Sequence, residues 1–122
     1  MKYRKATHLY TISETLIAGL VLSGEQVKAL NENKANFTAP YVSEGRLKGI
    51  SFYDQEQEIQ LLLHSKQFEF INQQIQQDGF TVIPLEIKRI GKYYKVIIAV
   101  AKGKKNYDKR RALLEDVVKK EI

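Results

Sequence analysis

The pattern of hydrophobic and polar positions predicts a chain built mainly of strands. From residue 8 to residue 22, polar and apolar side chains alternate and β-branched residues are frequent, which is typical of a long strand. The Ala18-Gly19 step indicates a bend or bulge in that strand, as a barrel corner requires. Pro40 places the next strand at a sheet edge or at a bulge, because proline cannot donate to a ladder. The further strands are expected at 36–43, 46–53, 80–89 and 92–101, the last two joined as a hairpin around Ile90-Gly91.

Two shorter stretches have helical periodicity. Ser23 can cap a helix that carries Val27 and Leu30 on one side and ends among residues 31–34. A second helix is expected over 65–77, with apolar positions at a spacing of three and four residues. The acidic, glutamine-rich segment 54–60 is interpreted as a loop. Five or six strands with two short helices predict a mainly β fold, a small antiparallel barrel of the oligonucleotide-binding type.

Composition narrows the function. The 122 residues form one domain and include no cysteine, which removes disulfides, thiol chemistry and cysteine-based zinc sites. The net charge of +6 favours a polyanionic partner. No apolar run approaches the roughly 20 residues of a membrane helix, and no signal-peptide core follows the N-terminus. We therefore expect a cytoplasmic protein without a membrane or small-molecule partner.

The positive charge gathers in one segment near the C-terminus. Residues 101–111 contain six Lys or Arg side chains, one Asp and, in their middle, Tyr107. Such side chains neutralise phosphates, and an exposed ring can stack on a base. The segment therefore predicts RNA binding, although Tyr107 could instead pack on the barrel and the charges could form a solvated run. We expect an RNA-binding barrel over 1–101 and a basic tail over 102–122. The tail's apolar stripe would form a helix only when docked.

The residues resemble the SmpB family, the SsrA-binding proteins that partner transfer-messenger RNA (tmRNA) in trans-translation. Four blocks carry the resemblance in the family's order: Arg4-Lys5-Ala6 through Gly24, Val27-Lys28 through Tyr41, Leu61-Leu62-Leu63-His64, and Gly79 through Arg110.

The resemblance implies a barrel that binds the tRNA-like domain of tmRNA and delivers it to stalled ribosomes. The tail would lie in the empty decoding centre and mRNA channel, against small-subunit rRNA. The family's usual Glu in the first helix is Gln26 here, and its Arg after the last Leu is Asn31. The loop before Leu61 is shortened and acidic, and the chain stops early, so we expect weaker RNA binding and a shorter channel-filling helix.

The resemblance also implies the binding residues. Those expected to contact tmRNA are Arg4, Lys5, His8, Gln26, Lys28, Lys34 and Asn36. Those expected at the decoding centre are Lys102, Lys104, Lys105, Tyr107, Asp108, Lys109, Arg110 and Arg111. Four of the residues expected to contact tmRNA, and His64 besides, have open alternatives. Asn36 could bond to backbone, Gln26 and Lys28 depend on the helix facing RNA, and His8 and His64 could be structural.

No converging acid, base or metal-ligand set is visible, so we expect neither an enzyme, nor a metal, nor a cofactor. A two-histidine ribonuclease using His8 and His64 is a minor alternative. A general RNA-binding or ribosome-associated barrel without tmRNA specificity is the main one. We expect a monomer of bacterial type, with an organellar origin left open.

Overall fold

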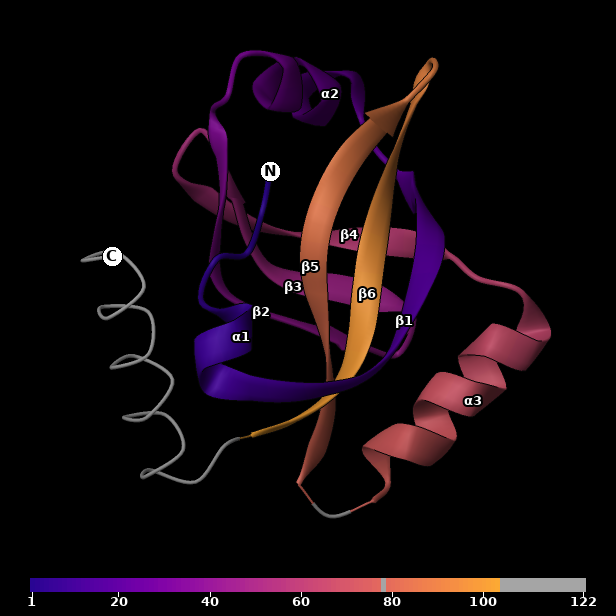
Figure 1. The fold of residues 1–122 in the computed structure, drawn as a ribbon. Coiled ribbons are helices and arrows are strands. Elements are labelled where there is room, and N and C mark those ends of the chain that lie inside the picture. Colours follow the sequence, from indigo (N-terminus) through magenta and orange to yellow (C-terminus); the bar gives the residue numbers. More distant parts are fainter. Residues whose placement is uncertain (78, 104–122) are drawn as a thin grey trace.

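Six strands and three helices make up the described part of the chain, residues 1–77 and 79–103 of a computed structural model (Figure 1). In chain order they are α1 (Ala6–Leu9), β1 (Tyr10–Val21), α2 (Gly24–Asn31), β2 (Ala35–Ser43), β3 (Arg46–Phe52), β4 (Gln55–Leu62), α3 (Ser65–Ile75), β5 (Phe80–Ile90) and β6 (Tyr93–Gly103). All the ladders between these strands are antiparallel.

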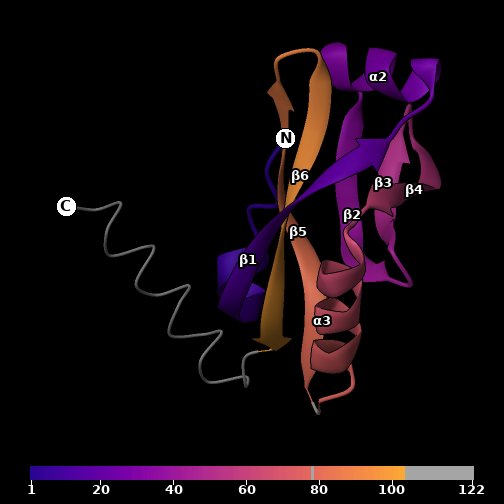
Figure 2. The same ribbon diagram turned by 90° about the vertical axis from the view of Figure 1, so that its right-hand side faces the viewer.

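The strands form one sheet in the order β2-β3-β4-β1-β6-β5. Its two outer strands, β2 and β5, lie against each other, so the sheet curls into a nearly closed barrel (Figure 2). The interior is filled by large side chains from opposite walls, among them Leu47, Phe52, Ile59 and Ile98. The predicted mainly β barrel is confirmed, because alternating inward side chains bury one continuous apolar face.

The N-terminal residues cover the seam between β5 and β2. The backbone N–H of Tyr3 donates to Leu85 O at 2.8 Å, and Ile87 N–H donates to Met1 O at 2.8 Å. On the other side of the seam, the Tyr3 ring meets the Phe37 ring edge-on at 5.8 Å between centroids. The segment therefore satisfies part of the exposed edge of β5, which would otherwise be free to pair with another chain.

The expected loop at 54–60 is wrong, because residues 55–60 of this segment belong to β4. Gln57 is half-buried and Ile59 and Leu61 are buried, whereas Glu56 and Glu58 face solvent. This alternation of period two is the pattern of a strand with one wet face. Glu and Gln have weak strand propensity, and pairing with β3 and β1 on both sides outweighs it.

Other boundaries agree in part. Both long helices and their predicted starts are confirmed, but α1 replaces the first residues of the long strand, which begins at Tyr10. The register irregularity of β1 lies between Ile12 and Glu14 rather than at Ala18-Gly19. Pro40 lies in an outer strand of the sheet, within a register shift of β2 against β3, as predicted. Strand β6 runs to Gly103, so Lys102 and Gly103 belong to the sheet.

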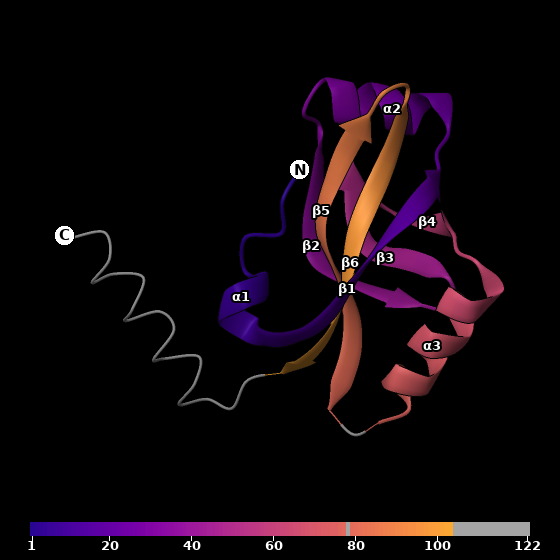
Figure 3. The same cartoon turned by 45° about the vertical axis from the view of Figure 1, so that its right-hand side comes forward.

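Helix α2 and the turn of the β5–β6 hairpin lie side by side at one end of the barrel (Figures 1 and 3). Helix α3 packs beside β5 toward the other end.

Candidate nucleic-acid interface

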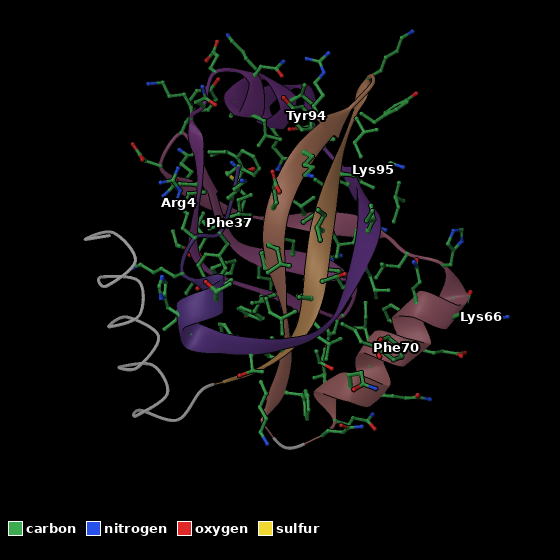
Figure 4. The ribbon with its side chains drawn as sticks, in the orientation of Figure 1. Arg4, Phe37, Lys66, Phe70, Tyr94 and Lys95 are labelled. Atoms are coloured by element: carbon green, nitrogen blue, oxygen red, sulfur yellow. The ribbon has the colours of Figure 1, made fainter. Side chains whose placement is uncertain are left out.

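Four of the residues predicted to contact tmRNA lie around β2. Arg4, Lys5 and Asn36 line one hollow between the N-terminal segment and β2. Lys34 and Asn36 line an adjoining hollow, which also includes Tyr53 and Asp54. Asn36 therefore joins both hollows, and the cations lie on either side of it. Figure 4 shows Arg4 and Phe37 on this flank of the molecule.

At the start of α2, the side chain of Gln26 is engaged within the protein. Its Oε1 accepts the Ser23 N–H at 2.9 Å, and the Ser23 Oγ accepts the Gln26 N–H at 3.2 Å. This reciprocal pair is a capping box, which satisfies two donors at the helix start. The Gln26 Nε2 also donates to Gln57 Oε1 in β4 at 2.8 Å. The second hydrogen of Nε2 and the second lone pair of Oε1 are still available for a contact with RNA, so the predicted role of Gln26 stays a prediction.

The end of α2 is tied to the barrel as well. The Tyr94 hydroxyl donates to Asn31 Oδ1 at 2.5 Å, which joins β6 to the last turn of the helix. The Tyr53 hydroxyl donates to Glu32 Oε2 at 2.9 Å. Desolvation and this hydrogen bond to a carboxylate raise the pKa of Tyr53 above its ordinary value. Gln26 and Asn31 replace the charged residues that the resemblance led us to expect, and both now fasten α2 to strands.

The remaining predicted residues are more scattered. Lys28 is exposed on α2, and His8 is half-buried in α1 and lines neither hollow around Asn36. Lys102 lies in β6, with its Nζ 5.8 Å from the centre of the Phe80 ring. His64 precedes α3, where its backbone N–H donates to Gln67 Oε1 at 3.1 Å. The other predicted decoding-centre residues lie outside the described part of the chain: Lys104, Lys105, Tyr107, Asp108, Lys109, Arg110 and Arg111. The expected helix of the tail lies outside it too.

Sequence reasoning missed an apolar strip on the outer wall of the barrel. Ile17 on β1 and Leu62 on β4 are 57% and 59% exposed, and Val21 on β1 is 47% exposed. Gly19 lies between the two β1 residues and pairs with Leu62 on one side and Lys95 on the other. A Cβ on Gly19 would come within 3.2 Å of the Leu62 side chain, so the glycine keeps this wall flat.

Adjoining large apolar side chains on a solvent-facing wall make this strip a candidate interaction surface. The signal in the sequence is the pair of apolar residues Ile17 and Val21, which alternate with Ala18 and Leu20 along β1.

The wall formed by β3 and β4 has the opposite character. Glu58 Oε2 lies 3.4 Å from Arg46 Nη1, and Glu58 Oε1 lies 3.8 Å from Lys48 Nζ. Glu56 Oε1 accepts from the Thr38 hydroxyl at 3.5 Å. The two cations of β3 are thus opposed by a carboxylate, which lowers their capacity to hold phosphates.

Within 1–77 and 79–103, His, Asp and Glu side chains form no group of three that could hold a metal ion. No helix in the same residues has the length and apolarity needed to cross a membrane.

The comparisons with known proteins agree with one another. A family model described as SmpB protein matches residues 1–122. The SsrA-binding protein of Shouchella clausii is 36% identical over 136 residues, covering 98% of this chain and 85% of its own. That of Clavibacter sepedonicus is 37% identical over 132 residues, covering 97% of this chain and 84% of its own.

The fold has a counterpart among solved structures. A chain from a structure of tmRNA-SmpB, described as a journey to the centre of the bacterial ribosome, superimposes with a TM-score of 0.68. It is 30% identical and the match covers 93% of both chains. Sequence and structure thus point to the same relatives over nearly the full length.

Proposed function

The chain belongs to the SmpB family, and from that premise we propose that it binds tmRNA and acts with it in trans-translation on stalled ribosomes. The observation that carries the proposal is the match of the SmpB model to residues 1–122, supported by relatives named SsrA-binding proteins. The solved tmRNA-SmpB counterpart supports both tmRNA and the ribosome as partners.

The geometry supports a role for the α2 end of the barrel in holding the tRNA-like domain. Lys28, Lys34, Asn36, Arg4 and Lys5 are exposed there or line the two hollows beside β2. The apolar strip beside Lys95 lies on β1 and β4, across the barrel from β2, and is a separate exposed surface. Cations that bracket a hollow suit a folded RNA, whose phosphates lie on either side of a groove.

The division of labour between barrel and tail is part of the proposal. The tail would contact rRNA of the decoding centre and the mRNA channel through its cations and Tyr107. Because β6 continues to Gly103, the barrel that binds tmRNA would comprise residues 1–103. The protein would work by binding alone, without catalysing a reaction, and in the cytoplasm where ribosomes translate.

The test combines a binding titration with a tagging assay. The full chain is titrated against a tmRNA tRNA-like domain, an ordinary tRNA and a single-stranded RNA of equal charge, at about 150 mM salt, where counterion release alone gives similar affinities. We expect clear preference for the tRNA-like domain. A truncation after Gly103 should keep that preference and lose tagging of stalled nascent chains.

Other results would redirect the proposal. Equal binding of all three RNAs would replace tmRNA recognition by general RNA binding, an outcome that the paired cations of β3 make worth testing. Loss of tmRNA binding by the truncation, with its melting temperature unchanged, would contradict the division between barrel and tail.

A further inference from the structure

The turn of the β5–β6 hairpin exposes an aromatic ring among cations. Tyr93 is 73% exposed, more than any other large apolar side chain in the described residues, and Ile90 opposite it is 50% exposed. Between them Gly91 adopts a φ of +64°, and nothing lies within 4 Å of a Cβ added there. The turn thus extends into solvent with its ring uncovered.

The register shows which side chains share a face with Tyr93. Opposite residues of an antiparallel pair point the same way, and so do residues two apart. Tyr93 pairs with Ile90, and Lys95 pairs with Lys88, so these four form one outward face. Lys95 also pairs with Gly19 of β1, which makes this face continuous with the apolar strip on the outer wall. Arg89 lies on the other face and Lys92 at the turn itself.

Most of these cations are free for a partner. Within the described part of the chain, Arg89, Lys92 and Lys95 take part in no ion pair, and only Lys88 has a carboxylate nearby, with its Nζ 3.9 Å from Glu86 Oε2. The Arg89 Nε donates to Gly91 O at 3.2 Å, which holds the guanidinium against the turn. The excess positive charge favours a polyanionic partner over an uncharged or apolar one.

The hairpin is also held in place. Tyr94 follows Tyr93 and points toward α2, where its hydroxyl bonds to Asn31 (Figure 4). This bond fixes the hairpin beside the helix whose Lys28 is proposed to contact tmRNA. A ring held on a fixed strand loses little conformational freedom when it binds, so its contact energy is retained.

We propose that the hairpin turn is a second RNA-contact site, in which Tyr93 stacks on an unpaired base while Lys92 and Lys95 hold the flanking phosphates. The inference rests on the proposed function, since it takes the RNA bound there as its ligand. A base needs an exposed ring, and its backbone needs cations on either side, and both are present on this face. A duplex offers no free base to such a ring, so the site would select an unpaired stretch of the folded RNA.

The experiment compares Tyr93→Ala and Tyr93→Phe in the full chain, titrated against the tRNA-like domain of tmRNA. Tyr93→Ala should weaken binding about fivefold or more, which is the smallest loss typical of a stacked base. Tyr93→Phe keeps the ring and should bind as the unchanged protein does. Tyr41→Ala is the matched control, because Tyr41 is a similarly exposed ring on β2, beside the carboxylates of β4. Its RNA affinity should not change.

A second pair tests the phosphate contact. Lys92→Ala should lower the slope of log K against log salt by about 0.7, the value for one contact to a single strand. Lys66→Ala removes the same charge from α3, where the side chain projects away from the hairpin (Figure 4), and should leave the slope unchanged.

The site would be overturned if Tyr93→Ala bound RNA as tightly as the parent protein. The proposed function would then still stand, provided that the parent protein prefers the tRNA-like domain. If the unchanged protein shows no such preference, the proposed function fails. Weaker binding of total RNA by Tyr93→Ala, but not by Tyr41→Ala, would then still support the stacking site. Melting temperatures of all variants should match, because Tyr93 buries little surface.

Discussion

The outer wall of β1, β6 and the hairpin and the wall of β3 and β4 belong to one sheet but are chemically opposite. On the first wall Lys95 is exposed beside Ile17 and Val21. On the second, Arg46 and Lys48 lie 3.4 Å and 3.8 Å from the carboxylate oxygens of Glu58. The barrel alternates side chains in and out in the same way on both walls. The residue types at the outward positions alone make the difference.

The comparison teaches that the availability of cations matters more than their number. A surface ion pair contributes little to stability, about 0–1 kcal/mol, but it places a negative charge where a phosphate would have to come. A net charge of +6 therefore says that the chain prefers polyanions. It does not say which wall binds them.

The largest expected effect is on stability, when a side chain is added at a glycine of β3 or at the glycine of the hairpin turn. In β3, Gly49 has a φ of +75°, and a Cβ there would lie 2.4 Å from Ala39 O of β2. We expect Gly49→Ala to cost about 3 kcal/mol or more, because overpacking adds to the left-handed strain. Gly91→Ala at the hairpin turn meets open space and should cost only about 1–2 kcal/mol of strain. Urea unfolding of both variants measures the difference.

Equal losses of unfolding free energy for the two glycine variants would contradict the view that the backbone is closely packed where β3 meets β2, whereas the hairpin turn is open. If Gly49→Ala yields no folded protein, the measured stability of Gly91→Ala against the unchanged chain still decides whether the turn tolerates a side chain.

A smaller effect is expected where the β4 wall supports α2. Gln57→Ala removes the acceptor of the Gln26 Nε2 hydrogen bond and should lower the free energy of unfolding by about 1 kcal/mol. Gln57→Glu keeps an acceptor at the same place and should retain most of that stability. Gln57→Lys presents a donor to a donor and should resemble the alanine variant. Urea unfolding of the three variants checks this order.

The same three variants test whether the bond also positions α2 for RNA. If it does, affinity for the tRNA-like domain should fall with Gln57→Ala and recover with Gln57→Glu, although the second adds a negative charge. An affinity that follows the charge alone, lowest for Gln57→Glu, would assign the bond a structural role only.

The smallest expected effect separates free from paired cations. Lys95→Ala and Lys48→Ala remove the same charge, one from each wall. Lys95→Ala should weaken binding of the tRNA-like domain by about threefold, close to one phosphate contact, and Lys48→Ala by less than about twofold. Equal losses in a titration at fixed salt would mean that net charge, rather than position, governs binding.

Much of the fold was predictable because local periodicity and burial agree. The Ser23 cap with Val27 and Leu30 predicted α2, and alternation predicted β2, β3, β5 and β6 within a few residues. Strand β4 was missed because its Glu and Gln residues have weak strand propensity. Glu56 and Glu58 in fact occupy outward positions, where a strand with one wet face carries polar residues. The seam covered by Met1 and Tyr3 had no local signal at all, since it forms between segments far apart in the chain.

The candidate site was predictable only in part. Residue type and resemblance selected Arg4, Lys5, Lys34 and Asn36, and the structure brings these around two adjoining hollows. They could not reveal that Gln26 bonds to Gln57 or that Asn31 bonds to Tyr94, because each bond joins residues on different elements. Nor could they reveal the exposed faces of Leu62 and Tyr93, which in sequence look like ordinary apolar strand positions.

The sequence by itself determined the kind of protein: a cysteine-free, basic β-barrel with the motifs of the SmpB family. Those properties reside in composition, in short-range periodicity and in residue order, and need no knowledge of the fold. Only the tertiary structure decided which cations are free, which amides fasten α2 and which apolar side chains face outward. These properties depend on which strands are neighbours and in what register, and pairing between distant segments sets both.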